Sequence, residues 1–479
     1  MATTQETDVV VIGGGATGEN VADYAHRGGL EVVLVESGLV GGECSYYACM
    51  PSKALLRPGQ ALAAARRVDG AAQAVTGTLD AAAVLRRRTA FTHGWDDSSQ
   101  VEWAAGAGLE LVRGAGRITG ERQVTVALDD GGERVLTARH GVVVATGSEP
   151  ATPPVEGLAA ARHWTTRDAT SAREVPGRLI VLGAGVAGSE LSQAYARLGA
   201  QVVLLARSRV LGAFPEPVAE LVGAGLAAAG VNVRSGVSAV SVDRPDGPDG
   251  EVRVRLDDGS TLAADELLVA TGRRPRTAGL GLTTLGVADG EALEVDDSGR
   301  VLAVAGGWLY AAGDVTGRAP LTHQGKYAGR VVGDALAARA AGHLPGPAEP
   351  WSRYAATADH VAVPQVVFTD PQVAQVGLRA DQARDRGRPV RTVHQDLGEV
   401  AGASLLADDY AGWAELVVDD ERDVVLGATF VGQGVAELLH AATIAVVGQV
   451  PLARLWHAVP AYPTTSEVWL RLLETDRAR

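Results

Sequence analysis

The sequence predicts an α/β protein in which two related parallel-sheet units precede a different C-terminal domain, and three observations support this. An apolar strand runs into a Gly-x-Gly-x-x-Gly motif twice, first at Gly13 and again at Gly183. Each motif is followed, in the same order, by a helical stretch, a second apolar strand, a hairpin pattern and an Ala-Thr-Gly segment. Beyond Trp351, strand and helix patterns alternate without such a motif. The repeated order indicates two units of one kind.

The first unit has the pattern of a dinucleotide-binding site. Residues 8–12 predict a short buried parallel strand, and Gly13, Gly15 and Gly18 follow it directly. These glycines allow a tight turn and let a pyrophosphate group sit at the N-terminus of the next helix, where unpaired N–H groups favour an anion. The second strand ends at Glu36, at the spacing expected for a carboxylate that binds a ribose hydroxyl.

The second unit repeats the glycine motif but has different residues at the end of its second strand. The strand at residues 178–182 leads into Gly183, Gly185 and Gly188. At the position that Glu36 occupies in the first unit, the acid is replaced by Arg207 and Arg209. Arginines there suit a 2′-phosphate, so we expect NADPH rather than NADH. The alternative is a pair of solvated surface arginines.

The only two cysteines of the chain, Cys44 and Cys49, lie in the stretch GGECSYYACMPSK. A disulfide across so short a loop is strained and easily reduced, which indicates that electrons pass through it. Gly42 permits close approach of the backbone to a ligand, and Pro51 suits the first turn of a helix. Two unrelated buried thiols or half of a metal site are alternatives, but no second cysteine pair is present to complete a zinc site. We expect no metal site.

Composition narrows the class of protein. The 479 residues suit two or three globular domains, and the formal net charge of −14 argues against nucleic acid or an anionic membrane as a partner. The N-terminal residues have no basic segment before an apolar one, as a secretory signal would. No apolar run approaches the roughly 20 residues of a membrane span. We therefore expect a cytoplasmic protein, in which a disulfide is catalytic rather than structural.

Together these motifs resemble the class I pyridine nucleotide-disulfide oxidoreductases, the family of dihydrolipoamide dehydrogenase, glutathione reductase and mercuric reductase. The resemblance extends from about Asp8 to Glu474. It rests on both glycine motifs, the C-x-x-x-x-C stretch, the two Ala-Thr-Gly segments, AAGDVTGR and VPQVVFTDPQVAQVGL. It implies two Rossmann-like domains that bind FAD and NAD(P), and a C-terminal α+β dimerisation domain.

The resemblance also implies a domain order and a set of cofactor-binding residues. Residues 1–150 and 276–345 would form the FAD-binding and central region, residues 151–275 the NAD(P)-binding domain, and residues 351–479 the dimerisation domain. The residues expected to bind FAD are Gly13, Gly15, Gly18, Glu36, Gly42, Lys53, Thr146, Gly147, Gly313, Asp314 and His323. Those expected to bind NADPH are Gly183, Gly185, Gly188, Arg207, Arg209 and Gly272.

The expected catalytic residues are Cys44, Cys49, Lys53, Glu190, Tyr462 and Glu467. By resemblance, Cys49 lies beside the flavin, Cys44 attacks an outside substrate, and Lys53 pairs with a glutamate, Glu190. At the C-terminus, most of these enzymes have a His-Pro pair followed by a Glu, and Tyr462 stands where that histidine belongs. A tyrosine titrates near 10 and a histidine near 6.5, so Tyr462 does not replace it as a base at neutral pH. His457 is the alternative base nearby.

The interpretation is an FAD-dependent homodimer, with its active site shared between subunits, that passes electrons from NADPH to the Cys44–Cys49 disulfide and on to a small disulfide or dithiol substrate. The alternative is a quinone or metal-ion reductase that uses Tyr462 in place of the histidine. Mercuric reductases, however, resemble one another in a C-terminal cysteine pair that this chain lacks. A non-catalytic flavoprotein subunit and an enzyme for one dedicated biosynthetic disulfide are further alternatives.

Overall fold

We describe a computed structural model of the protein, which covers residues 3–479. Two compact units make up the chain, and each is assembled from three separate stretches. The first unit contains the residues up to Met50 together with Thr89–Ala151 and Arg273–Asp359. The second contains Pro51–Arg88, Thr152–Gly272 and His360–Arg479. The expected domain boundaries stay a prediction.

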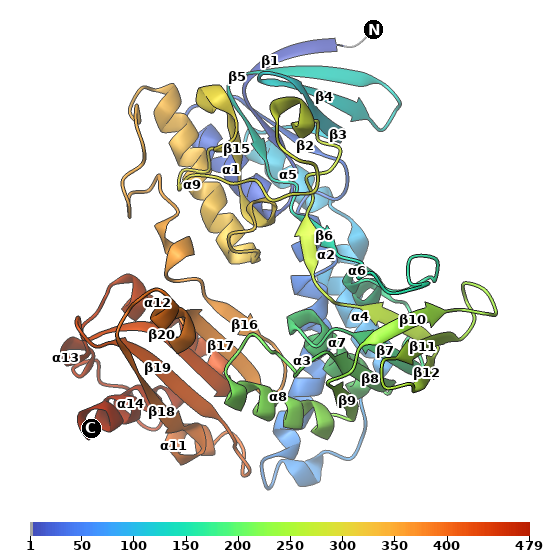
Figure 1. The fold of residues 1–479 in the computed structure, drawn as a ribbon, viewed down its shortest axis with the longest axis vertical. Coiled ribbons are helices and arrows are strands. Elements are labelled where there is room, and N and C mark those ends of the chain that lie inside the picture. Colours follow the sequence, from blue (N-terminus) through green and yellow to red (C-terminus); the bar gives the residue numbers. More distant parts are fainter. Residues whose placement is uncertain (1–2) are drawn as a thin grey trace. The chain divides into compact units, whose positions relative to one another are not determined.

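The first unit is built on a parallel sheet in the order β3-β2-β1-β5-β15, extended by an antiparallel meander of β3, β4 and β5. Figure 1 shows these strands with helices α1 and α9 beside them. The strands are β1 (Thr3–Ile12), β2 (Val32–Glu36), β3 (Glu110–Gly120), β4 (Gln123–Leu128), β5 (Glu133–Val144) and β15 (Leu309–Ala311). The helices are α1 (Ala16–Arg27), α2 (Gly42–Tyr46), α5 (Ser98–Gly106) and α9 (Thr322–Ala340). A short antiparallel pair, β6 (Ser148–Pro150) and β14 (Arg273–Pro275), completes it.

Strand β2 shows why strands of this sheet have apolar residues at successive positions in the sequence. Val33 and Val35 pack into one hydrophobic cluster of the unit, whereas Val32 and Leu34 pack into the other. Successive side chains of a strand point to opposite faces, so a sheet that is covered on both faces requires apolar residues at every position.

Helices α1 and α9 approach each other unusually closely because glycines of α9 face α1. A Cβ atom on Gly325, Gly329 or Gly333 would lie 2.3, 2.6 or 2.7 Å from atoms of Thr17 or Tyr24. The three glycines are spaced four residues apart, which places them on one face of the helix. The N-terminal turns of both helices are therefore held side by side, next to the residues of the candidate site.

The second unit contains a parallel sheet in the order β13-β7-β8-β9, a three-stranded antiparallel sheet and a five-stranded antiparallel sheet. The first two consist of β7 (Arg178–Leu182), β8 (Gln201–Ala206), β9 (Val231–Ser235), β13 (Glu266–Val269), β10 (Ala239–Asp243), β11 (Val252–Leu256) and β12 (Thr261–Ala264). The third has the order β16 (Gln365–Val367), β17 (Gln372–Gly377), β20 (Val424–Gly432), β19 (Trp413–Asp419) and β18 (Val390–Asp396). Its longer helices are α7 (Val186–Arg197), α8 (Glu216–Ala228), α12 (Leu439–Val447) and α14 (Val468–Arg477).

Helix α3 (Cys49–Arg66) begins in the first unit and continues in the second, and α4 (Ala81–Phe91) ends in the first. The shorter helices are α6 (Thr166–Ser171), α10 (Ala380–Asp385), α11 (Ala401–Ser404) and α13 (Leu452–Leu455). Within residues 3–479, no helix combines the length and the apolar character that crossing a membrane requires.

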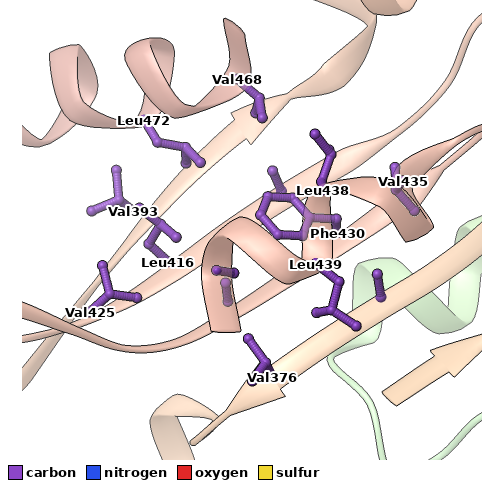
Figure 2. Close-up of a cluster of buried hydrophobic side chains, with 14 of the residues drawn as sticks. Val376, Val393, Leu416, Val425, Phe430, Val435, Leu438, Leu439, Val468 and Leu472 are labelled. Atoms are coloured by element: carbon purple, nitrogen blue, oxygen red, sulfur yellow. The ribbon is translucent and has the colours of Figure 1, made fainter. Parts of the chain in front are cut away.

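The C-terminal region has its own hydrophobic core, between the five-stranded sheet and its helices. Figure 2 shows the side chains that meet there: Val376, Val393, Leu416, Val425, Phe430, Val435, Leu438, Leu439, Val468 and Leu472. Other residues of this sheet, Val367, Val373 and Val431, pack instead into the core of the parallel sheet of the same unit.

Candidate functional site

The cysteine loop of the first unit lies against the first glycine turn. Gly41 N–H donates to Gly14 O at 2.8 Å, and a Cβ on Gly42 would lie 2.8 Å from Gly15 Cα. Gly41 and Gly42 have φ angles of 102° and 64°, a region that favours glycine. The loop therefore packs backbone against backbone on the turn, and the approach of Gly42 to a ligand stays a prediction.

The turn itself has the shape that the motif predicts. Gly13 has a φ angle of 105°, and a Cβ there would lie 2.5 Å from Ala145 O. A Cβ on Gly18 would lie 1.8 Å from Gly13 O, so only glycine fits. At the end of β2, Glu36 accepts hydrogen bonds from the N–H groups of Gly14 and Gly38, both at 2.6 Å. Its carboxylate is thus fixed at the mouth of the turn.

Two further residues of the expected FAD set, Asp314 and Thr146, take part in a hydrogen-bond network of the first unit. Ser148 Oγ donates to Asp314 Oδ2 at 2.6 Å, and Arg273 Nε donates to Ser148 Oγ at 2.7 Å. Thr146 Oγ1 donates to Arg276 O at 2.6 Å, between the two Ala-Thr-Gly regions. Gly147 and Gly313 have φ angles of 74° and 80°, so glycine is favoured at both positions.

The network reaches the cysteine loop through Glu43, which precedes Cys44. Arg273 Nη2 lies 2.5 Å from Glu43 Oε2, and Arg276 Nη2 lies 3.7 Å from Glu43 Oε1. The sequence analysis did not include these arginines, because the chain separates them from Glu43 by more than 200 residues.

The two cysteine thiols are in contact with each other and with the start of α9. Cys49 Sγ lies 3.2 Å from Thr322 Oγ1, and His323 follows Thr322 in the first turn of that helix. The hydrogen bond to Cys49, together with burial, raises the pKa of Cys44, whereas Thr322 and Lys326 act in the opposite direction. Sharing one negative charge between two sulfurs favours a single thiolate in the pair.

The second glycine turn repeats the first in the second unit. Gly183 has a φ angle of 104°, and a Cβ on Gly188 would lie 1.8 Å from Gly183 O. Gly185 is the N-cap of α7, and Gly272 has a φ angle of 140°. Of the expected arginines, Arg207 is exposed, whereas Arg209 donates through Nη2 to Phe214 O at 2.8 Å and so also holds its own loop.

The expected pair of Lys53 and Glu190 forms within the second unit. Lys53 Nζ lies 2.7 Å from Glu190 Oε2, and the Glu190 side chain is only 3% exposed. The other oxygen, Oε1, accepts from Phe368 N–H at 2.8 Å, and Lys53 Nζ lies 4.8 Å from the centre of the Phe368 ring. A buried carboxylate with both oxygens occupied holds the lysine charge in one position.

The C-terminal residues expected at the site differ in exposure. Tyr462 is 76% exposed, and His457 is exposed as well. Glu467 is buried, with Oε1 at 2.7 Å from Arg471 Nη2 and Oε2 without a hydrogen-bond partner. Val459, within this segment, is 84% exposed, and Ile444 of α12 is 57% exposed. Within residues 3–479, no cluster of three or more His, Cys, Asp or Glu side chains is arranged to hold a metal ion.

Comparison with known proteins decides the family. A model of the pyridine nucleotide-disulphide oxidoreductases matches residues 7–329, and a model of their dimerisation domain matches residues 363–472. The chain belongs to this family. The sequence-based recognition, the fold class and the assignment as a flavin-dependent enzyme are therefore confirmed.

Among the relatives, the mercuric reductase of Shigella flexneri is 33% identical over 468 residues, which cover 96% of this chain and 79% of that protein. Dihydrolipoyl dehydrogenase 3 of Pseudomonas aeruginosa is 34% identical over 478 residues, 96% of each chain. A Cu(II) complex of the HOCl-induced flavoprotein disulfide reductase RclA of Escherichia coli shares the fold. It has a TM-score of 0.82 and 22% identity over 98% of this chain and 99% of that one.

Family membership makes FAD and NAD(P)H the cofactors, and the two glycine turns fit them. At Gly13 and Gly18 the turn leaves no room for a side chain, and Glu36 stands fixed beside the first turn. The dimerisation domain supports a homodimer. The individual roles of the site residues stay a prediction.

Sequence reasoning missed three residues of the first unit that lie near the cysteines. They are Thr322, which contacts Cys49, Lys326, which acts on Cys44, and Glu19, which interacts with Lys326. The sequence carried one usable signal, since Lys53 and Lys326 are its only lysines. Nothing in the spacing links residue 44 to residue 326.

Proposed function

We propose that the protein is an NADPH:disulfide oxidoreductase in which Cys44 and Cys49 pass electrons to a small disulfide substrate. The observation that carries the proposal is the contact between the two thiols in a loop packed on the first glycine turn, with Thr322 at 3.2 Å from Cys49. Bound FAD would supply the exchange of electron pairs between the pyridine nucleotide and the cysteines.

The cysteine residues carry out two thiol exchanges. The thiolate of Cys44 attacks one sulfur of the substrate disulfide, forming a mixed disulfide and releasing the first substrate thiolate, which takes up a proton. Cys49 then loses its proton and attacks the Cys44 sulfur, which releases the second substrate thiolate and forms the Cys44–Cys49 disulfide. The second substrate thiolate also takes up a proton. The substrate thus gains two electrons and two protons; the cysteine pair supplies both electrons, and it releases one proton when the Cys44 thiolate forms and one when Cys49 ionises.

The other residues expected at the site have supporting roles in this proposal. Glu36 and Asp314 orient the FAD sugar and ribityl hydroxyls, with Asp314 held by Ser148. The Lys53–Glu190 pair provides a fixed positive charge for the reduced cofactor, because Glu190 is itself fixed by Phe368 N–H. Arg207 selects NADPH through its 2′-phosphate. Tyr462 and Glu467 position the substrate, in an active site shared between the subunits of the homodimer.

Turnover of a Cys44→Ser variant tests the proposal. In the FAD-loaded protein, NADPH-dependent reduction of the aromatic disulfide DTNB is expected to fall by about 1000-fold or more, because the attacking sulfur is gone. Ser45→Ala is the matched control from the same loop and keeps most of the activity. Undiminished DTNB reduction by the Cys44→Ser variant contradicts the assignment.

A second candidate function follows from Tyr462 and from the mercuric reductases among the relatives. In this alternative, a quinone or a metal ion accepts electrons without a C-terminal base. Menadione or Hg²⁺ in place of DTNB distinguishes the two candidates. Turnover with menadione that survives Cys44→Ser, in an enzyme that reduces no disulfide, favours the alternative.

A further inference from the structure

The start of helix α9 presents two side chains toward the cysteines. Thr322 is the first residue of α9 and contacts Cys49 through its hydroxyl. Lys326 follows four residues later, so both side chains lie on the same face of the helix, one turn apart. The glycine contacts between α1 and α9 hold this face in place, because Gly325 packs on Thr17.

Lys326 is the nearby cation that acts on the thiol pair. Its side chain is exposed, and its ammonium group opposes the effects of Cys49 and burial, which raise the pKa of Cys44. Thr322 and Lys326 both act on Cys44, and they lie one turn apart on α9.

Glu19, one residue after the last glycine of the first turn, interacts electrostatically with Lys326. Its Oε1 atom is buried and has no hydrogen-bond partner. Burial raises the pKa of Glu19 to about 7, with Lys326 lowering it and Glu36 raising it. The phenol of Tyr46, in α2 beside the cysteine loop, is the further titratable group on which Glu19 acts.

We propose that Lys326 is a positioning residue that stabilises the thiolate of Cys44, and that Glu19 is the ionisable partner that weakens this effect when it loses its proton. The proposal rests on the proposed function, in which Cys44 is the attacking sulfur. It supplies, from α9 of the same unit, a positive charge of the kind that a protonated histidine at position 462 would have provided. Such a charge is what a reactive cysteine requires.

The two residues are expected to act in opposite directions. Replacing Lys326 by Gln removes the cation and leaves less Cys44 thiolate at a given pH. Replacing Glu19 by Gln removes the competing anion, so more thiolate is present above about pH 7, where Glu19 is ionised in the unaltered protein. Below about pH 6 the Glu19 substitution has little effect, because the native carboxyl is protonated there.

The test is the rate of alkylation of Cys44 by iodoacetamide in the reduced, FAD-loaded protein between pH 6 and pH 9. Fragmentation of the peptide that carries both cysteines assigns the site by mass spectrometry. The Lys326→Gln variant is expected to react about three to ten times more slowly at pH 7.5, since an exposed charge shifts a pKa by up to about one unit. Lys326→Arg restores most of the rate, and Arg330→Gln, one turn further along α9, is the matched control.

The Glu19→Gln variant provides an independent measurement, with Cys44 alkylation expected to be about two to three times faster at pH 8 and unchanged at pH 6. If Lys326→Gln does not retain FAD, the Glu19→Gln variant alone tests the proposal. An alkylation profile that is the same in Glu19→Gln and the unaltered protein overturns the proposal, as does a Lys326→Gln profile that equals that of Arg330→Gln. Because alkylation requires no acceptor, these results stand apart from the DTNB assay, whose failure would contradict the proposed function instead.

Discussion

The two glycine turns of the molecule share a backbone and differ in their side chains. The φ angles of Gly13 and Gly183 are 105° and 104°. A Cβ on Gly18 or on Gly188 would lie 1.8 Å from the carbonyl oxygen of the first glycine in its own turn. Such a match in two separate parts of the chain shows that the turn is set by backbone geometry alone.

The side chains around the turns differ at two equivalent places. The first turn has Glu36 bonded to backbone N–H groups at its mouth, whereas the second has the exposed Arg207. After the last glycine, the first turn has Glu19 with an unpaired oxygen, and the second has Ser189, whose hydroxyl donates to Ala184 O at 3.3 Å. The two turns therefore have the same backbone shape, and the side chains beside them are what distinguishes one from the other.

The largest effect is expected from alanine at the last glycine of either turn. Gly18→Ala forces a methyl group against Gly13 O, so the FAD absorbance per protein chain is expected to fall below about one tenth of its normal value. Gly188→Ala is the matched variant; it keeps FAD and raises the NADPH KM by about 100-fold. Loss of FAD in both variants would mean that the turns do not bind separate cofactors.

Reversing the charge at Arg207 tests the difference between Glu36 beside the first turn and Arg207 beside the second. We expect Arg207→Glu to lower the ratio of kcat/KM for NADPH to that for NADH by about 10- to 100-fold, because a charged hydrogen bond contributes about 1.5–3 kcal/mol. Steady-state kinetics with both nucleotides measure this ratio. Arg209→Gln is a second variant of the same site: the ratio also falls if Arg209 binds the 2′-phosphate, and it is unchanged if Arg209 only holds Phe214 O. An unchanged ratio in Arg207→Glu contradicts the assignment of the second turn to NADPH.

Neutralising Glu36 is the corresponding test on the first turn. Glu36→Gln keeps the side-chain volume and loses the charge that accepts from two N–H groups. The Kd for FAD, measured by fluorescence quenching, is expected to rise about tenfold, which corresponds to about 1.4 kcal/mol. The NADPH KM should not change. If it rises while FAD binding stays normal, the two turns have been assigned in the wrong order.

The smallest effect is expected when Glu19 is replaced by the serine that follows the second turn. The pKa of Glu19 is raised from 4.5 to about 7 in the folded protein, so between these values the folded state holds a proton that the unfolded state has lost. The free energy of unfolding therefore falls as the pH rises through that window.

Glu19→Ser removes this pH dependence. We compare the free energy of unfolding of the variant with that of the unaltered protein at each pH. This difference is expected to be about 1–2 kcal/mol more favourable to the variant at pH 8 than at pH 4. Urea unfolding of the FAD-loaded protein at the two pH values measures the difference. A variant whose stability follows that of the unaltered protein at both pH values shows that Glu19 is solvated in the folded state.

The sequence predicted most of the fold because the strongest signals in this chain are local. Buried strands such as β2 and β7 appear in the sequence as apolar runs, and Gly18 and Gly188 are required by contacts with Gly13 O and Gly183 O inside the same short turns. The pairing of Lys53 with Glu190 came from the family resemblance rather than from local pattern.

The tertiary structure decided what surrounds the cysteines. Cys44 and Cys49 were evident from the sequence, but the atoms that act on them come from residues 322 and 326, brought close by glycine-mediated packing of α9 on α1. The sequence by itself determined that a disulfide can form and be reduced here, because this chemistry needs only two cysteines that are close together in the chain. The tertiary structure decided which charges act on the two cysteines. Electrostatic interaction depends on distance in space, and residues far apart in the sequence can be close together in the folded chain.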